Sequence, residues 1–178
     1  MKGNDVTGLL NQGLMCVVLL ALWSAPVAAQ SSALHWATDA KSGCRIWDPH
    51  PQPNQSISWS GQCVGGLAEG RGTVQWYKDA LPLERDEGVW HQGRQTGEGS
   101  QVWPTGSYRG NLHDGEPSGH GILTVGDARY EGEFINGKPD GGGTLRNSAG
   151  VFQGVWRNGC FRDDKRKIAM GTPVNSCP

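Results

Sequence analysis

Four cysteines downstream of an N-terminal apolar run could form disulfides or bind a metal ion, because thiols pair by oxidation and clustered thiolates ligate zinc. They are Cys44, Cys63, Cys160 and Cys177. No Cys-x-x-Cys pair occurs and the thiols are far apart in sequence, so a zinc site is disfavoured. Four cysteines allow three pairings. We expect the two local disulfides, Cys44 with Cys63 and Cys160 with Cys177, which close loops of about 20 residues.

A group of imidazoles and carboxyls could act as an acid/base or metal-binding set. It consists of His113, Asp114, Glu116 and His120. However, Asp114 precedes a glycine in a predicted turn, and the two histidines fall on opposite arms of the predicted hairpin. Gly-x-Gly recurs without forming GxGxxG, and GxSxG, HExxH, SxxK and P-loop motifs are absent from the sequence. We therefore expect surface histidines, no enzyme activity, no metal and no cofactor.

Seven tryptophans follow residue 29, and indole rings either pack in a core or stack on ligands such as sugars. They are Trp36, Trp47, Trp59, Trp76, Trp90, Trp103 and Trp156. The last five fall at the alternate positions of the predicted strands that point to the buried face, which favours core packing. A glycan-binding surface is the alternative interpretation.

The overall composition excludes several functional classes. The 178 residues carry a formal charge of -1 and a mean hydropathy of -0.51, and 28 of them are glycine. A near-neutral chain lacks the positive field that nucleic-acid binding requires. One short apolar run is incompatible with a protein that crosses a membrane several times.

The N-terminal segment has the layout of a secretory signal. Lys2 precedes an apolar run over residues 14–23, and the small residues Val27 and Ala29 occupy the positions that a signal peptidase reads. A membrane span needs about 20 apolar residues, roughly twice the length of this run, so a retained anchor is the less favoured alternative. We expect cleavage after Ala29 and a periplasmic or extracellular protein.

The glycines are periodic. After the first glycine of each copy, others follow at offsets of 5, 9 and 11 residues, and successive copies begin 27, 22, 22 and 22 residues apart. A fifth copy retains only its first two glycines. The grid comprises Gly61, Gly66, Gly70, Gly72, Gly88, Gly93, Gly97, Gly99, Gly110, Gly115, Gly119, Gly121, Gly132, Gly137, Gly141, Gly143, Gly154 and Gly159. Such a period indicates a repeat architecture.

Large side chains lie two residues before or after the first glycine of each copy, which is the period of a half-buried β-strand. The repeat aromatics are Trp59, Trp90, Tyr108, Tyr130, Phe134, Phe152 and Trp156. In three copies Asp or Asn precedes the second glycine, a pair typical of a tight hairpin turn. Glycine on the buried face leaves bare backbone that an aromatic ring can cover. Each copy is therefore predicted to be a hairpin that packs on the next.

These copies resemble the MORN repeat family, whose pattern is Tyr-x-Gly-x-Trp/Phe, then x-x-Gly, then Gly-x-Gly. Residues 130–143 fit the pattern throughout, and residues 108–121 fit except for Leu112 at the aromatic position. Cys63 replaces the second aromatic of the first copy, and Asp86 replaces the leading aromatic of the second, where we expect the ring column to be interrupted. The resemblance implies scaffolding or tethering roles, often at membranes.

We therefore expect an all-β fold, an elongated single-layer antiparallel meander of repeated β-hairpins that is capped at both ends. The predicted segments are a signal peptide at 1–29, an N-terminal cap at 30–58, a repeat domain at 59–161 and a C-terminal tail at 162–178. The cap protects the first strand from pairing with other chains. The basic run 165–167 in the tail is interpreted as a solvated segment, with contact to anionic lipid as the alternative.

For function, we expect a non-catalytic exported scaffold or tether that contacts another protein of the cell envelope. The alternative is a module that holds a glycan or a lipid head group over exposed aromatics. Nucleic acid is not an expected partner.

Overall fold

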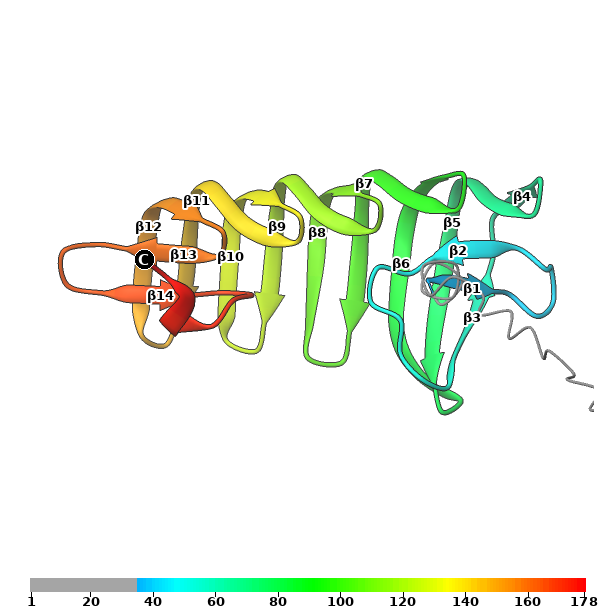
Figure 1. Ribbon diagram of the computed structural model, residues 1–178, viewed down its shortest axis with the longest axis horizontal. Helices are drawn as coiled ribbons and strands as arrows, with labels where there is room; N and C mark the ends of the chain where they lie inside the picture. Colours follow the sequence, from blue (N-terminus) through cyan, green and yellow to red (C-terminus); the bar gives the residue numbers. More distant parts are fainter. Residues whose placement is uncertain (1–34) are drawn as a thin grey trace, which may run out of the picture.

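The computed structural model describes residues 35–178, so the predicted signal peptide and its cleavage site lie outside the described residues. Within these residues, fourteen strands form one connected sheet, followed by a short 3-10 helix, η1 (Val174–Ser176). Figure 1 shows the long strands side by side along the longest axis of the molecule. The predicted all-β meander of antiparallel hairpins is confirmed.

Eight long strands make up the body, and each pairs antiparallel with the next in sequence. They are β5 (Leu67–Lys78), β6 (Leu81–His91), β7 (Arg94–Trp103), β8 (Gly106–His113), β9 (Glu116–Val125), β10 (Ala128–Ile135), β11 (Lys138–Asn147) and β12 (Gly150–Arg157). Six short strands flank them at the two ends: β1 (Trp36–Thr38), β2 (Arg45–Trp47), β3 (Gln55–Trp59), β4 (Gln62–Val64), β13 (Cys160–Arg162) and β14 (Lys167–Ala169).

The hairpin turns have the backbone conformation that their sequences require. Both residues of each turn have φ between 48° and 84° in the pairs Gln92 with Gly93, Asp114 with Gly115, Asn136 with Gly137, and Asn158 with Gly159. Two consecutive positive φ angles are the signature of a type I′ turn, which matches the twist of the strands it joins. The five extra residues of the first interval lengthen the β5–β6 hairpin, whose turn is Asp79 with Ala80.

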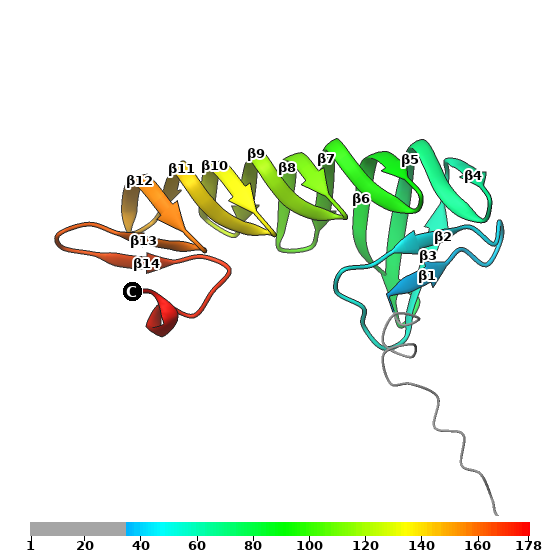
Figure 2. The same cartoon turned by 45° about the horizontal axis from the view of Figure 1, so that its top comes forward.

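The hairpin tips curve over instead of continuing in a plane, as Figure 2 shows along the top of the molecule. The pairing register shifts beside Gly110 and beside Gly132, so each strand bends where the backbone is bare. Each tip also bonds to the tip before it. The amides of Gly115, Gly137 and Gly159 donate to the carbonyls of Gln95, Pro117 and Pro139 at 3.0, 2.9 and 2.7 Å. The sheet is therefore a trough.

The buried side chains form two separate clusters. One lies in the C-terminal half and contains Tyr108, Leu112, Tyr130, Phe134, Leu145, Phe152, Trp156 and Phe161. The other lies beneath the N-terminal cap and contains Cys44, Ile46, Ile57, Ala68, Val74, Trp76 and Trp90. The core is thus divided along the axis of the repeat.

Short hairpins cover both ends of the trough. In Figure 1, β1 with β2 and β13 with β14 run across the direction of the long strands. The first hairpin is attached through the Trp47 amide, which donates to the Gly93 carbonyl at 2.8 Å. Disulfides join Cys44 to Cys63 and Cys160 to Cys177, with Cα atoms 5.7 and 5.5 Å apart. The ends therefore carry a local second layer over a sheet that is single in the middle.

Candidate functional site

The leading ring of a copy lies back over the glycines of its own hairpin. A Cβ added at Gly143 would overlap the Tyr130 ring, one at Gly121 would overlap the Tyr108 ring, and one at Gly72 would overlap the Trp59 ring. This is the arrangement predicted from the alternation of rings and bare backbone. The glycines are required here because no other residue leaves room for the ring.

The polar atom of each leading ring bonds to the same place in its copy. Trp59 Nε1 donates to the Gln62 carbonyl at 3.0 Å, Tyr108 Oη to the Asn111 carbonyl at 2.7 Å, and Tyr130 Oη to the Glu133 carbonyl at 3.2 Å. Burial raises the pKa of both tyrosines to about 12, so each hydroxyl keeps the proton that it donates.

Ring contacts run through the C-terminal cluster and join one pair in the N-terminal cluster, but none links the two clusters within the described residues. Edge-on contacts join Trp59 to Trp90 in the N-terminal cluster and Tyr108 to Phe134 in the C-terminal one, with ring centroids 4.9 and 5.3 Å apart. Between residues 35 and 178, no ring pair bridges Trp90 and Tyr108. The interruption coincides with Asp86, which occupies the place of the leading aromatic.

A polar layer fills the interruption. Asp86 is 5% exposed, and its Oδ2 accepts a hydrogen bond of 2.6 Å from Trp76 Nε1. Beside it, the buried Gln95 donates to the Glu87 carbonyl at 3.2 Å, and Gln101 donates to Gln95 Oε1 at 3.2 Å. Asp86 Oδ1 is sealed from solvent and, apart from the adjoining Glu84 carboxyl, has no hydrogen-bond partner within residues 35–178. A buried carboxyl oxygen without a donor is costly, so this layer stands out from the rest of the core.

Three carboxyl groups near this layer have raised pKa values. Burial raises the pKa of Asp86 well above its ordinary value, and the negative charge of Glu84 raises it further. Burial also raises the pKa of Glu84 and of Asp48. The three groups belong to β6 and to the loop after β2, so the cap and the sheet jointly build an acidic environment.

These carboxyl groups line a cavity of about 360 Å³ between the cap and the inner face of the trough. Its walls include Trp47, Trp76, Trp103 and Tyr108, and the tips at Gly115 and Gly137 also border it. A shallower hollow of about 550 Å³ shares His50, Gln52, Leu83, Glu84 and Trp103 with the cavity. Glu84 and Trp103 therefore lie at its mouth.

Cation and aromatic contacts hold the cap over this cavity. The Arg94 guanidinium lies 4.1 Å from the centre of the Trp47 ring and 5.7 Å from that of Trp36. The same side chain pairs with Asp114 at 2.7 Å. At the rim, His50 Nε2 lies 3.6 Å from a Glu116 carboxylate oxygen. The sheet thus fixes the position of the loop that carries Asp48.

The four residues weighed as an acid/base or metal set have separate partners. Asp114 pairs with Arg94, and Glu116 contacts His50 in the cap. His113 is opposite Glu116 in the β8–β9 register, whereas His120 is opposite Glu133 in the β9–β10 register. No three His, Cys, Asp or Glu residues in the described part of the chain are grouped so that they could hold a metal ion.

The basic run of the tail makes contacts within the chain. Arg166 pairs with Asp163 at 2.7 Å and lies 4.4 Å from the centre of the Phe152 ring. Lys167 Nζ donates to the Cys177 carbonyl at 2.8 Å. Two of the three basic groups thus hold the C-terminal hairpin in place.

The acidic cavity was missed by the sequence analysis. In the sequence, Asp86 stands out only as a departure from the repeat pattern, and neither Glu84 nor Asp48 stands out at all. The sequence feature that indicates this site is an acidic residue at a position where other copies have an aromatic ring. A buried acid with a perturbed pKa is often part of a functional site.

Comparison with known proteins identifies the repeats. The MORN repeat pattern matches residues 87–107, 108–127 and 130–150, which fall within the run from β6 to β12. Such repeats generally serve as modules for contact with proteins or membranes. No curated protein matches the chain. Among the residues described, none lies in a helix long and apolar enough to span a membrane.

Proposed function

We propose that this MORN-repeat chain is a non-catalytic scaffold or tether that is exported to the cell envelope and contacts a partner protein there through its repeat surface. The observation that carries the proposal is that the matched residues 87–150 form an uninterrupted run of stacked hairpins. From Tyr108 onward their rings pack between repeats, so this part of the array has an internal core and outer faces.

Two features support contact through a face instead of an edge. Hairpins fastened by disulfides cover both ends of the trough, which disfavours the addition of further strands. The outward-facing side chains include Ile135 and Val155, which are 55% and 63% exposed. These exposed apolar groups are available to a partner.

The alternative of a glycan surface built on exposed aromatics receives no such support. Trp76, Trp90 and Trp156 are buried, and Trp36, Trp47, Trp59 and Trp103 are half-buried. None of these seven rings offers an open platform. A partner-binding scaffold is therefore the function that the described residues favour.

Site-specific photocross-linking in the native cells tests the partner contact. A photoreactive residue at Ile135 or at Val155 is expected to capture one protein of defined mass. The same residue at Lys165, exposed in the C-terminal tail, is the control and is expected to capture none. Absence of a product from both repeat positions, or a product from Lys165 alone, would contradict contact through the repeats.

Export is tested separately by N-terminal sequencing of the protein purified from fractionated cells. We expect a mature chain that begins at Gln30 in the envelope or the medium. Recovery in the cytosol with residues 1–29 still attached would contradict the proposed location.

A further inference from the structure

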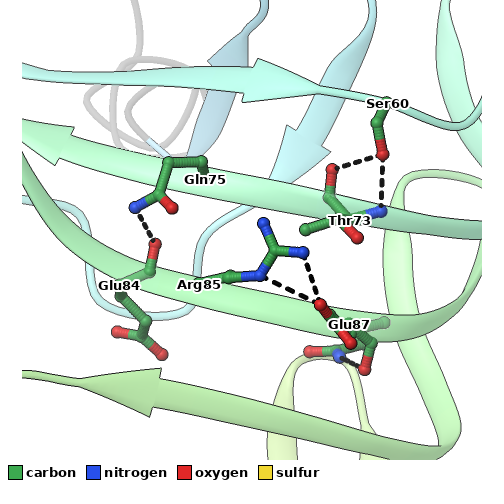
Figure 3. A network of polar contacts seen from close by, with 7 residues as sticks. Ser60, Thr73, Gln75, Glu84, Arg85 and Glu87 are labelled. Carbon is green, nitrogen blue, oxygen red and sulfur yellow. Dashed lines mark hydrogen bonds and ion pairs between the residues drawn. The ribbon is translucent and has the colours of Figure 1, made fainter.

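The cavity beneath the cap holds more acid than base. Its charged lining groups are Asp48, His50, Glu84, Asp86, Glu116 and Lys138. Among residues 35–178, none of Asp48, Glu84 and Asp86 forms an ion pair, while Glu116 contacts His50. Figure 3 shows the contrast on β6, where Arg85 pairs with Glu87 while the Glu84 backbone carbonyl accepts a hydrogen bond from Gln75. The Glu84 carboxyl contacts the Asp86 carboxyl instead of a cation. Carboxyl groups collected in excess over cations repel one another.

Asp86 provides a second and independent observation. This side chain is 5% exposed, lines the cavity, and uses only Oδ2, to accept the Trp76 hydrogen bond. Apart from its contact with the adjoining Glu84 carboxyl, Oδ1 is buried and receives no hydrogen bond from another donor among the described residues. Two adjoining carboxyls that share one proton keep a negative charge and unused acceptor positions, and a ligand that supplies a donor from the cavity side would occupy them.

The aromatic walls specify the kind of donor. Trp103 lies at the mouth beside Glu84, and Trp76 lies inside against Asp86. Indole faces attract cations, and carboxylates form short charge-assisted hydrogen bonds with nitrogen donors. A neutral sugar could stack on the rings but would supply no positive charge to the acidic groups. A metal ion is disfavoured, because no three ligating groups are suitably placed in the part of the chain that the structure describes.

We propose that this cavity binds an organic cation, an ammonium or guanidinium group, held by the Glu84 and Asp86 carboxyls and by the rings of Trp76 and Trp103. A volume of about 360 Å³ accommodates one such group with its aliphatic stem. The site is independent of the proposed scaffold function, because it lies on the inner face under the cap and needs no partner on the outer faces.

Isothermal titration of the purified, disulfide-bonded protein tests the site. The cationic probes are the Nα-acetyl methylamides of lysine and arginine, together with putrescine. The neutral probes are the norleucine analogue, which keeps the aliphatic stem without the charge, and N-acetylglucosamine. We expect at least one cationic probe to bind and both neutral probes to fail. If no cationic probe binds at millimolar concentration, or if a neutral probe binds equally well, the proposal is overturned.

The cationic probes also separate the two sources of the group. Stronger binding of the amino-acid derivatives than of putrescine assigns the site to a basic side chain of a polypeptide. The reverse order assigns it to a free amine. Either result supports the cation site, and neither depends on the cross-linking result at Ile135 and Val155.

Variants locate the binding. Glu84→Gln is nearly isosteric, and we expect it to lower the affinity for the best cationic probe by at least about tenfold. Trp103→Leu removes the ring at the mouth and is expected to weaken it as well. Glu98→Gln on the outer face is the matched control and should leave affinity unchanged. Retention of full affinity by folded Glu84→Gln and Trp103→Leu, with circular dichroism matching the wild type, would overturn the assignment.

Discussion

Neighbouring glycines on β11 show how a single atom decides the packing of a repeat. A Cβ at Gly143 would overlap the Tyr130 ring, whereas a Cβ at Gly142 meets nothing within 4 Å. Neither residue has the positive φ that by itself favours glycine. The difference between them is therefore steric and depends on which face of the strand each one occupies.

Gly143→Ala is expected to destabilise the protein by about 1–3 kcal/mol, because the ring must move away from the backbone it covers. Gly142→Ala is the matched control and should change the free energy of unfolding by less than about 0.5 kcal/mol. Urea unfolding followed by tryptophan fluorescence measures both. Equal effects of the two variants would contradict the role of bare backbone beneath the ring.

Asp86 provides a pH-dependent prediction at the same scale. Because its pKa is raised in the folded chain, the native state holds a proton that the unfolded state releases above its ordinary pKa of 3.8. Stability should therefore fall as pH rises from that value toward the raised pKa. Asp86→Asn cannot titrate, so its free energy of unfolding should decline less between pH 5 and pH 8 than that of the wild type.

The comparison uses urea unfolding at both pH values, with Glu98→Gln on the outer face as the control. That control is expected to keep the wild-type slope. Glu84 and Asp48 line the same cavity with raised pKa values and contribute to the remaining slope. Parallel declines for wild type and Asp86→Asn would contradict a raised pKa at this position.

At the scale of elements, the hairpin tip is the unit that repeats. Its two turn residues have positive φ, and its glycine amide bonds to the previous tip. The backbone conformation of a tip is therefore linked to its position on the neighbouring tip. A tip that loses its turn geometry also loses the bond that stacks it on its neighbour.

Asn158 in the turn between β12 and β13 tests this link, since its φ is 48°. Asn158→Ala is expected to cost about 1 kcal/mol, because a Cβ without a polar side chain disfavours the left-handed conformation. Asn158→Gly is the control and should be tolerated better, because glycine adopts this conformation without a steric penalty. Thermal unfolding compares them; a more damaging glycine variant would show that the turn conformation is not the determinant.

At the scale of the whole molecule, two disulfides hold hairpins across the ends of the trough. The bridges span 19 and 17 residues of sequence, so the loop-entropy estimate gives about 3 kcal/mol for each. Their consequences differ by location. Cys44 and Cys63 hold the cap over the acidic cavity, whereas Cys160 and Cys177 hold the tail against the last repeat.

Paired serine variants separate the two ends. The double variant Cys44→Ser with Cys63→Ser is expected to increase amide hydrogen exchange mainly in residues 35–58. It is also expected to weaken the binding of any ligand in the cavity. Cys160→Ser with Cys177→Ser is the reciprocal control and should increase exchange mainly in residues 160–178. Uniform exchange across the chain in both variants would show that the bridges act on global stability alone.

The sequence by itself determined the repeat, because glycine spacing and the parity of the rings are local properties of the chain. The offsets of Gly132, Gly137, Gly141 and Gly143 predicted the strands, and Asn136 before Gly137 predicted the turn between them. These features follow from backbone conformations that few residues adopt, so their positions could be predicted without any tertiary contact.

Only the tertiary structure decided where the acidic groups meet. Asp48 is 38 residues from Asp86 in sequence, and the two line one cavity because the cap folds back across the trough. Nothing local in either segment encodes that approach. The approach of Asp48 to Asp86 depends on the curvature of the sheet and on the Arg94 contacts with the cap. Both arise only when all the strands are assembled.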